Sequence, residues 1–193
     1  MSKAPTKSTL LGISGRGGSR PNRSKLLVDQ NLAASLHRPR YETPKGEGLV
    51  YISAGAPDSN QPFNEWWKGY PGAPGAAEIK PDRMALTLEG FQKFFAQDLA
   101  TDEIELLYCL QGPYASVAND DKIKKAAWKD KPSWFIFVEN DQMLLKELER
   151  DSAVKLGAKS LVLPSSHVPM LSHPAEVANF IESAAREMGE ASS

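Results

Sequence analysis

Short, nearly uninterrupted apolar runs alternate with amphipathic segments along the second half of the chain. The runs lie within residues 134–138 and 159–163, and apolar residues recur at helical spacing over about 143–156 and 174–188. Continuous apolar runs are typical of strands that are covered on both faces of a parallel sheet. The order strand, helix, strand, helix therefore predicts an α/β fold in which right-handed crossovers join neighbouring parallel strands.

Two further apolar runs precede this pattern. Residues 48–54 predict another buried strand, which Gly55-Ala56-Pro57 closes, and residues 8–14 form a shorter strand-like run. Leucines at near-helical spacing predict a helix within residues 24–37. The basic, glycine-rich stretch 15–23 lacks the Gly-Lys-[Ser/Thr] ending of a phosphate-binding loop, so a flexible segment is the favoured interpretation.

The middle of the chain predicts a lid over the sheet. Residues 59–81 hold many prolines and glycines, which indicates an irregular excursion. Helices are predicted over 87–98 with Thr87 as the N-cap, from residue 101 onward, and over 114–128. We therefore expect a helical insertion between two strands, with the lid at about 59–128.

Composition narrows the function classes. The 193 residues are 41% hydrophobic and 24% charged with a formal net charge of -1, which argues against nucleic-acid or membrane binding driven by bulk charge. The single cysteine, Cys109, excludes a disulfide framework and a cysteine-based zinc site, and its apolar surroundings predict a core residue. No apolar run approaches the ~20 residues that span a membrane, and the N-terminus lacks the apolar core of a signal peptide. A cytoplasmic location is expected.

Two polar groups follow two strands that should be neighbours. Asp141 comes after the run 134–138, and His167 comes after the run 159–163. Because parallel strands end at the same edge of a sheet, we expect a carboxylate oxygen of Asp141 to lie about 2.6–3.2 Å from a ring nitrogen of His167. Such a contact holds a histidine in the tautomer that leaves its other nitrogen free as a base.

Both the acid and the histidine of this pair have alternative interpretations. Glu139 and Asp58 are competing acids, since each also follows a predicted strand. His167 is alternatively a surface-loop residue that caps or packs without any chemistry.

Three segments together resemble the α/β-hydrolase superfamily, in particular small serine-esterase-like members with a helical lid. They are residues 49–58, 134–141 and 165–174, and Ser-Ser-His-Val-Pro-Met is their most specific part. The similarity extends over about residues 48–188. It implies a partial α/β-hydrolase fold, with a parallel sheet of three or four strands flanked by helices and a helical lid insertion.

The resemblance also implies a catalytic serine, for which Ser14 is the candidate. The family pattern Gly-x-Ser-x-Gly does not occur, and the nearest stretch is Gly12-Ile13-Ser14-Gly15-Arg16-Gly17, in which Arg16 replaces a glycine. By resemblance, Ser14 attacks, His167 acts as base and then acid, and Asp141 orients it. The family's first four strands would precede Ser14, so the sequence is expected to be the C-terminal portion of such a hydrolase: a fragment, a truncated form or a degenerate homologue.

Two functions therefore compete. The first is hydrolysis of a small ester or related carbonyl substrate by a Ser-Asp-His mechanism, impaired by truncation; the second is a non-catalytic binding or interaction module. Ser14 folded within reach of His167 favours the first, and disorder over residues 1–40 favours the second. No metal or organic cofactor is implied, because the three histidines lack metal-type spacing with carboxylates.

The predicted organisation is an irregular N-terminal segment, residues 1–47, which holds a remnant of the nucleophile strand and helix, and a hydrolase-like domain, residues 48–193. An apolar strand left at the edge of the sheet, at 49–54 or 9–13, predicts marginal stability or self-association.

Overall fold

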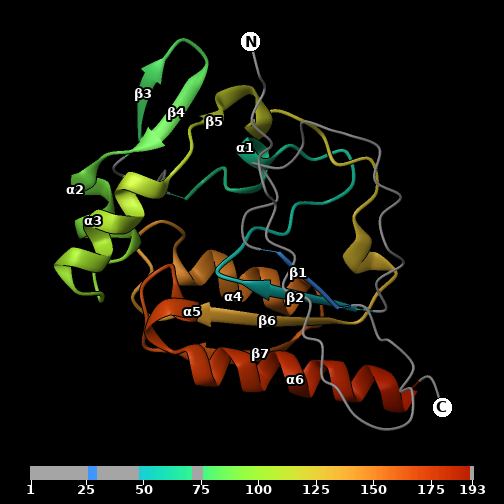
Figure 1. Ribbon diagram of the computed structural model, residues 1–193. Coiled ribbons are helices and arrows are strands. Elements are labelled where there is room, and N and C mark those ends of the chain that lie inside the picture. The colour runs from blue at the N-terminus through green and yellow to red at the C-terminus, as the bar shows by residue number, and fades with distance from the viewer. Residues whose placement is uncertain (1–25, 30–47, 71–75, 192–193) are drawn as a thin grey trace, which may run out of the picture.

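A parallel sheet forms the centre of the protein (Figure 1). The computed structural model describes residues 26–29, 48–70 and 76–191. The sheet has four strands in the order β1-β2-β6-β7, and every neighbouring pair is parallel. The strands are β1 (Leu26–Asp29), β2 (Gly48–Ile52), β6 (Ser133–Val138) and β7 (Lys159–Leu163). This confirms the predicted parallel sheet and the strands predicted after residue 47.

The strand β1 falls inside residues 24–37, where a helix was predicted, and that prediction is wrong over Leu26–Asp29. These four residues pair with Gly48–Tyr51 of β2. Pairing completes the hydrogen bonds along an edge of β2 that would otherwise stay open, and such tertiary pairing overrides local spacing. β2 is therefore flanked on both sides, so residues 49–52 do not form the predicted free edge. The other candidate edge, residues 9–13, lies outside the described residues.

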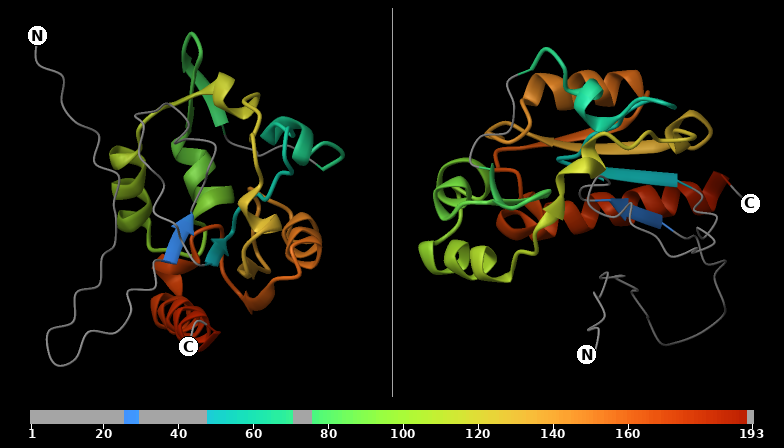
Figure 2. Two further views of the ribbon diagram at one scale, coloured as in Figure 1. Left: turned by 90° about the vertical axis from the view of Figure 1, so that its right-hand side faces the viewer. Right: turned by 90° about the horizontal axis from the view of Figure 1, so that it is seen from above.

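Helices cover the two faces of the sheet. α4 (Lys146–Lys155) links β6 to β7, and α6 (Pro174–Ala191) follows β7 after the single turn α5 (Pro169–Ser172). Viewed from above, α4 and α6 lie on opposite sides of the strands (Figure 2, right). Gly157, with φ of +60°, follows α4 in the left-handed conformation that commonly ends helices. The predicted strand–helix–strand–helix order is confirmed.

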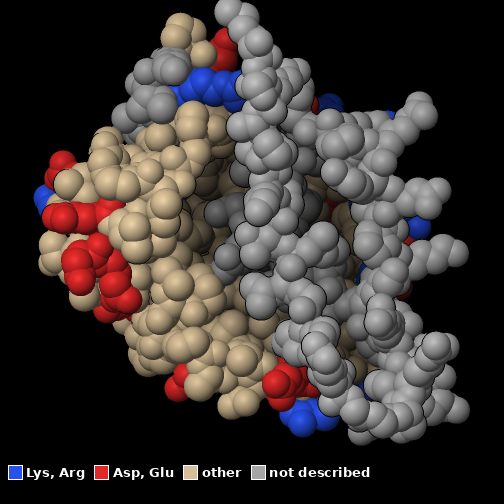
Figure 3. Space-filling view, in the orientation of Figure 1, with Lys and Arg blue, Asp and Glu red and all other residues tan. Residues whose placement is uncertain are grey.

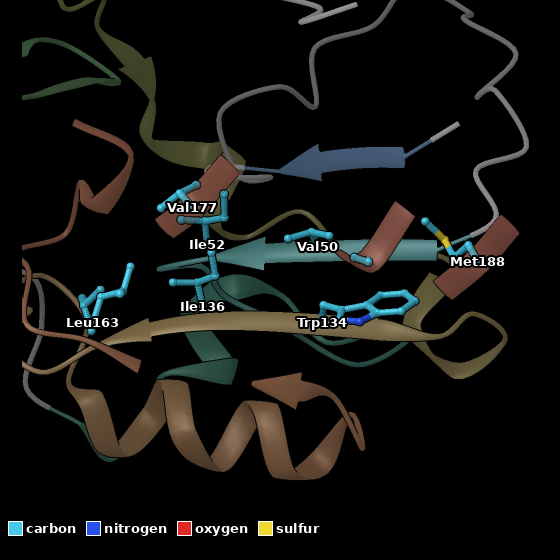
Figure 4. Close-up of a cluster of buried hydrophobic side chains, with 9 residues drawn as sticks. Val50, Ile52, Trp134, Ile136, Leu163, Val177 and Met188 are labelled. Atoms are coloured by element: carbon cyan, nitrogen blue, oxygen red, sulfur yellow. The ribbon is translucent and has the colours of Figure 1, made fainter. Parts of the chain in front are cut away.

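The main hydrophobic core lies between the sheet and α6 (Figure 4). Alternate residues of β6 face it, as the two-residue period of a strand requires. Its buried members are Val50, Ile52, Trp134, Ile136, Val138, Leu163, Val177, Ala184 and Met188. Gly48 allows the end of α6 to approach β2, because a Cβ atom there would lie 2.3 Å from the Met188 sulfur.

The lid between β2 and β6 is mixed rather than helical. Its elements are α1 (Phe63–Trp66), β3 (Ala76–Lys80), β4 (Arg83–Leu86), α2 (Leu88–Gly90), the π-helical turn η2 (Phe91–Phe95), α3 (Thr101–Leu110), β5 (Tyr114–Ala115) and the 3₁₀ turns η3 (Ser116–Asn119) and η4 (Ala127–Lys129). β3, β4 and β5 form an antiparallel sheet. The predicted helical insertion is therefore helical only in part, and within residues 59–81, where an irregular excursion was predicted, α1 and β3 are regular elements.

Particular lid residues explain these differences. Residues 114–128 are not a helix, because Tyr114 and Ala115 pair with β4 instead. The predicted N-cap role of Thr87 is confirmed, since its Oγ1 accepts a hydrogen bond of 2.9 Å from the Gly90 amide. Cys109 is exposed rather than buried, because α3 directs only Ile104 fully into the core.

Candidate active site

Asp141 lies just beyond the carboxyl end of β6 and is held by its own loop. Its Oδ1 accepts hydrogen bonds from the backbone amides of Met143, at 2.7 Å, and Leu144, at 2.9 Å. The residue is buried. One carboxylate oxygen is thus committed to the turn before α4, which leaves the other oxygen free to contact a second group.

That second group is His167. Its Nδ1 lies 2.7 Å from Oδ2 of Asp141, and the two side chains are 7% and 0% exposed, respectively. The distance agrees with the geometry predicted from the sequence. The ladder between β6 and β7 continues into both loops, because the Glu139 amide donates to the Leu163 carbonyl and the Asn140 amide to the Ser165 carbonyl. This continuation brings the acid and the imidazole together.

Neither competing acid is the one paired with His167. Asp58 forms an ion pair with Lys129 and a second one, at 3.6 Å, with Lys155. The hydrogen bond from Lys129 is the main reason that the pKa of Asp58 lies below its ordinary value. Glu139 is exposed. Asp141 is therefore the acid that contacts His167.

The lid covers this pair. In Figures 1 and 2 the helices α2 and α3 lie beyond the carboxyl ends of the parallel strands, at the edge where the loops after β6 and β7 emerge. The Phe95 ring, at the end of η2, lies 5.2 Å from the His167 ring at an interplanar angle of 48°. Phe91 packs beside it in a cluster with Ile104 and Val168. The lid thus places an apolar wall against one side of the imidazole.

Known proteins share this architecture. The profile of the alpha/beta hydrolase family matches residues 4–180. The chain belongs to the alpha/beta hydrolase family. Among curated protein sequences, none matches it significantly.

Solved structures agree with that family. Polyneuridine aldehyde esterase superposes with a TM-score of 0.61 at 21% identity, covering 73% of this chain and 63% of its own. A pyrethroid hydrolase from Sphingobium faniae gives 0.57 at 18% identity, covering 74% and 62%. A methylesterase from Arabidopsis gives 0.57 at 17% identity, covering 74% and 60%. The chain thus spans less than two thirds of the length of each of these, and the likeness shows a shared fold.

The candidate nucleophile of this alpha/beta hydrolase, Ser14, lies outside the described residues. Among the residues that are described, no three His, Cys, Asp or Glu side chains gather as a metal site. None of the described helices is both long and apolar enough to cross a membrane.

Sequence reasoning missed a buried acid, Glu149 of α4. It is fully buried; its Oε2 accepts a 3.2 Å hydrogen bond from the Val138 amide, and its Oε1 has no partner among the described residues. Burial is the largest cause that raises its pKa, and the nearby charge of Asp141 raises it further. The available signal was periodicity, because Glu149 occupies the same helical stripe as Leu148, Ser152 and Ala153.

Replacing Glu149 with glutamine is expected to stabilise the protein at neutral pH. A glutamate whose folded pKa is raised stabilises fully below its ordinary pKa of 4.5, and this contribution is lost as pH rises toward the folded pKa. Glu149→Gln should therefore flatten the fall of unfolding free energy above pH 4.5. Urea denaturation from pH 4 to 9 measures it, with the exposed Glu147→Gln of the same helix as control. Parallel pH profiles for wild type and Glu149→Gln would contradict this.

Ser53 was also missed. It follows β2 with φ of +41°, a left-handed backbone uncommon for serine, and its buried Oγ has no partner among the described residues. Its amide still donates to the Ile136 carbonyl at 2.9 Å, so the ladder extends to this residue.

Proposed function

We propose that this alpha/beta hydrolase cleaves a small ester or related carbonyl substrate, with Ser14 as nucleophile, His167 as base and then acid, and Asp141 as the orienting group. The observation that carries the proposal is the buried 2.7 Å contact between Asp141 and His167 at the carboxyl edge of the sheet. A carboxylate on Nδ1 stabilises the tautomer with the proton on Nδ1, which leaves Nε2 as the base. The names of the superposed structures, two esterases and a pyrethroid hydrolase, support the same reaction class.

The proposed reaction has two halves. In the first, Nε2 of His167 removes the proton from Ser14, the Ser14 oxygen bonds to the carbonyl carbon, and the imidazolium returns that proton to the departing alcohol. In the second, His167 activates a water that attacks the acyl group, and the proton returns to Ser14 as the acid leaves. Asp141 stabilises the imidazolium in both halves without itself taking the proton.

Arg16 is expected to make this reaction slow. The backbone amide of the residue after the nucleophile, here Gly15, supplies one oxyanion donor, and the turn that aims it needs small residues. Misplacing one such donor costs ~10²–10³ in rate. We therefore expect turnover well below that of an intact esterase.

The test combines covalent labelling with turnover. A fluorophosphonate probe should label Ser14, and Ser14→Ala and His167→Ala should each abolish labelling and the hydrolysis of p-nitrophenyl acetate. Labelling at another residue, or hydrolysis that survives Ser14→Ala, would exclude the proposed nucleophile. A folded chain that neither reacts with the probe nor hydrolyses the ester would favour the second candidate function, a binding module. The replacement of a family glycine by Arg16 also favours that candidate.

A further inference from the structure

Two consecutive lid residues, Gln97 and Asp98, reach the two loops that hold the acid and the histidine. The first of them contacts the acid loop. Nε2 of Gln97 donates a hydrogen bond of 2.6 Å to the backbone carbonyl of Asn140, which directly precedes Asp141. The Oε1 of Gln97 is buried without a partner among the described residues. In the opposite orientation of the side-chain amide, Oε1 would face the Asn140 carbonyl oxygen and could not donate to it. The orientation with Nε2 toward Asn140 is therefore the one that forms the hydrogen bond.

The second contacts the histidine loop. Oδ2 of Asp98 accepts a hydrogen bond of 2.9 Å from the Ser166 amide and one of 3.2 Å from Oγ of Ser165. Both serines are fully buried, and Ser166 directly precedes His167. Hydrogen bonds to a carboxylate are stronger than those between neutral groups.

A wider serine network supports the Asp98 contact. Oγ of Ser165 lies 2.7 Å from Oγ of Ser172, which in turn lies 3.0 Å from Nδ1 of His173. Partial burial pushes the pKa of Asp98 upward, but hydrogen bonds from Ser166, Ser172 and Ser165 outweigh it and leave the pKa below the ordinary value. Asp98 is therefore an anion at neutral pH, able to accept from all of these donors.

We propose that Gln97 and Asp98 form a lid clamp that holds the acid loop and the histidine loop in register. They are positioning residues: each acts through the residue that precedes Asp141 or His167, and neither is assigned to the substrate. Because the two anchors are adjacent in the chain, a movement of the lid shifts both loops together. The catalytic consequence rests on the proposed hydrolase function, whereas the positioning does not.

The clamp predicts a measurable loosening of both loops. Asp98→Ala removes the acceptor of the Ser166 amide, so hydrogen exchange around residues 165–168 should become about tenfold faster. Gln97→Glu removes the donor to Asn140 at constant size and should speed exchange at residues 139–141 similarly. In both variants the NMR signal of the His167 Nδ1 proton should broaden or shift, because its contact with Asp141 becomes less uniform.

Matched controls come from the same lid. Acidic side chains gather over the outer side of the lid (Figure 3). Glu105 of α3 is one exposed acid of the lid. The variant Glu105→Ala therefore removes the same charge as Asp98→Ala without changing a contact to either loop. Gln92→Glu makes the same chemical change as Gln97→Glu at an exposed position of η2. Asp98→Asn keeps an oxygen that can accept from Ser166 and should restore most of the wild-type behaviour.

Turnover gives an independent readout. Misplacement of reacting groups by the order of 1 Å costs ~10² in rate, so the clamp variants should lower kcat about 10- to 100-fold while KM changes by less than about threefold. Wild-type exchange and an unchanged His167 signal in both clamp variants would overturn the clamp. Absence of Ser14-dependent turnover in the wild type would instead overturn the proposed function, and the exchange and NMR measurements would still decide the clamp. Should Asp98→Ala fail to fold, the comparison of Gln97→Glu with Gln92→Glu decides it by the same readouts.

Discussion

Replacing Asp141 with asparagine is expected to lower kcat by about 10⁴-fold, the loss that the same change causes in a serine-histidine-aspartate triad. Asparagine can keep its Oδ1 on the amides of Met143 and Leu144, which Asp141 now holds. The amide nitrogen then faces Nδ1 of His167, which must accept rather than donate. The proton of the neutral imidazole then lies on Nε2. Nε2 therefore has no free lone pair and cannot act as the base.

The tautomer itself can be measured, so this prediction does not depend on a fast enzyme. Nitrogen NMR of the imidazole should place the proton on Nδ1 in the wild type and on Nε2 in Asp141→Asn. Asp58→Asn is the matched control, because Asp58 also follows a strand of the sheet but pairs with Lys129 and Lys155. A decrease in kcat of less than about tenfold, or an unchanged tautomer, would remove Asp141 from the proposed mechanism.

Replacing Ile136 with alanine is expected to lower the free energy of unfolding by about 2–5 kcal/mol. Ile136 is 0% exposed at the centre of β6, where Ile52 and Leu161 flank it in register on the two neighbouring strands. Truncation removes buried apolar surface and leaves a cavity that neighbours held by the sheet cannot fill. The loss is large against the ~5–15 kcal/mol by which natural domains are stable.

Urea denaturation at neutral pH measures this loss as a lower midpoint with an unchanged slope. The control is Val162→Ala on β7, since Val162 is 44% exposed and loses little burial on truncation. Its expected cost is below about 1 kcal/mol. Similar losses for the two variants would mean that the face of the sheet against α6 is not the main source of stability.

The sequence by itself determined the elements whose patterns agree with their surroundings. The apolar runs that became β2 and β6 lie between two covered faces, so their composition and their structure have the same cause. The run that became β7 lies at the edge of the sheet, where Val162 is 44% exposed. The contact between Asp141 and His167 followed from the same logic, because parallel neighbours joined by one helix must end at one edge. The Thr87 cap is a local hydrogen bond, and local sequence was sufficient to predict it.

Only the tertiary structure decided the features that depend on distant partners. Leu26–Asp29 form a strand because β2 offers an unpaired edge, which outweighs their helical spacing. Tyr114 and Ala115 likewise follow β4 rather than their own predicted helix.

The sequence did not predict the polar contacts around the site, for a related reason. The burial of Glu149 depends on how α4 packs against β6, and the contacts of Gln97 and Asp98 with Asn140 and Ser166 join segments more than 40 residues apart. A polar side chain has the same identity whether it meets water or a backbone amide. The partner that decides its role is chosen by the packing of the lid against the sheet, which no local pattern in the sequence records.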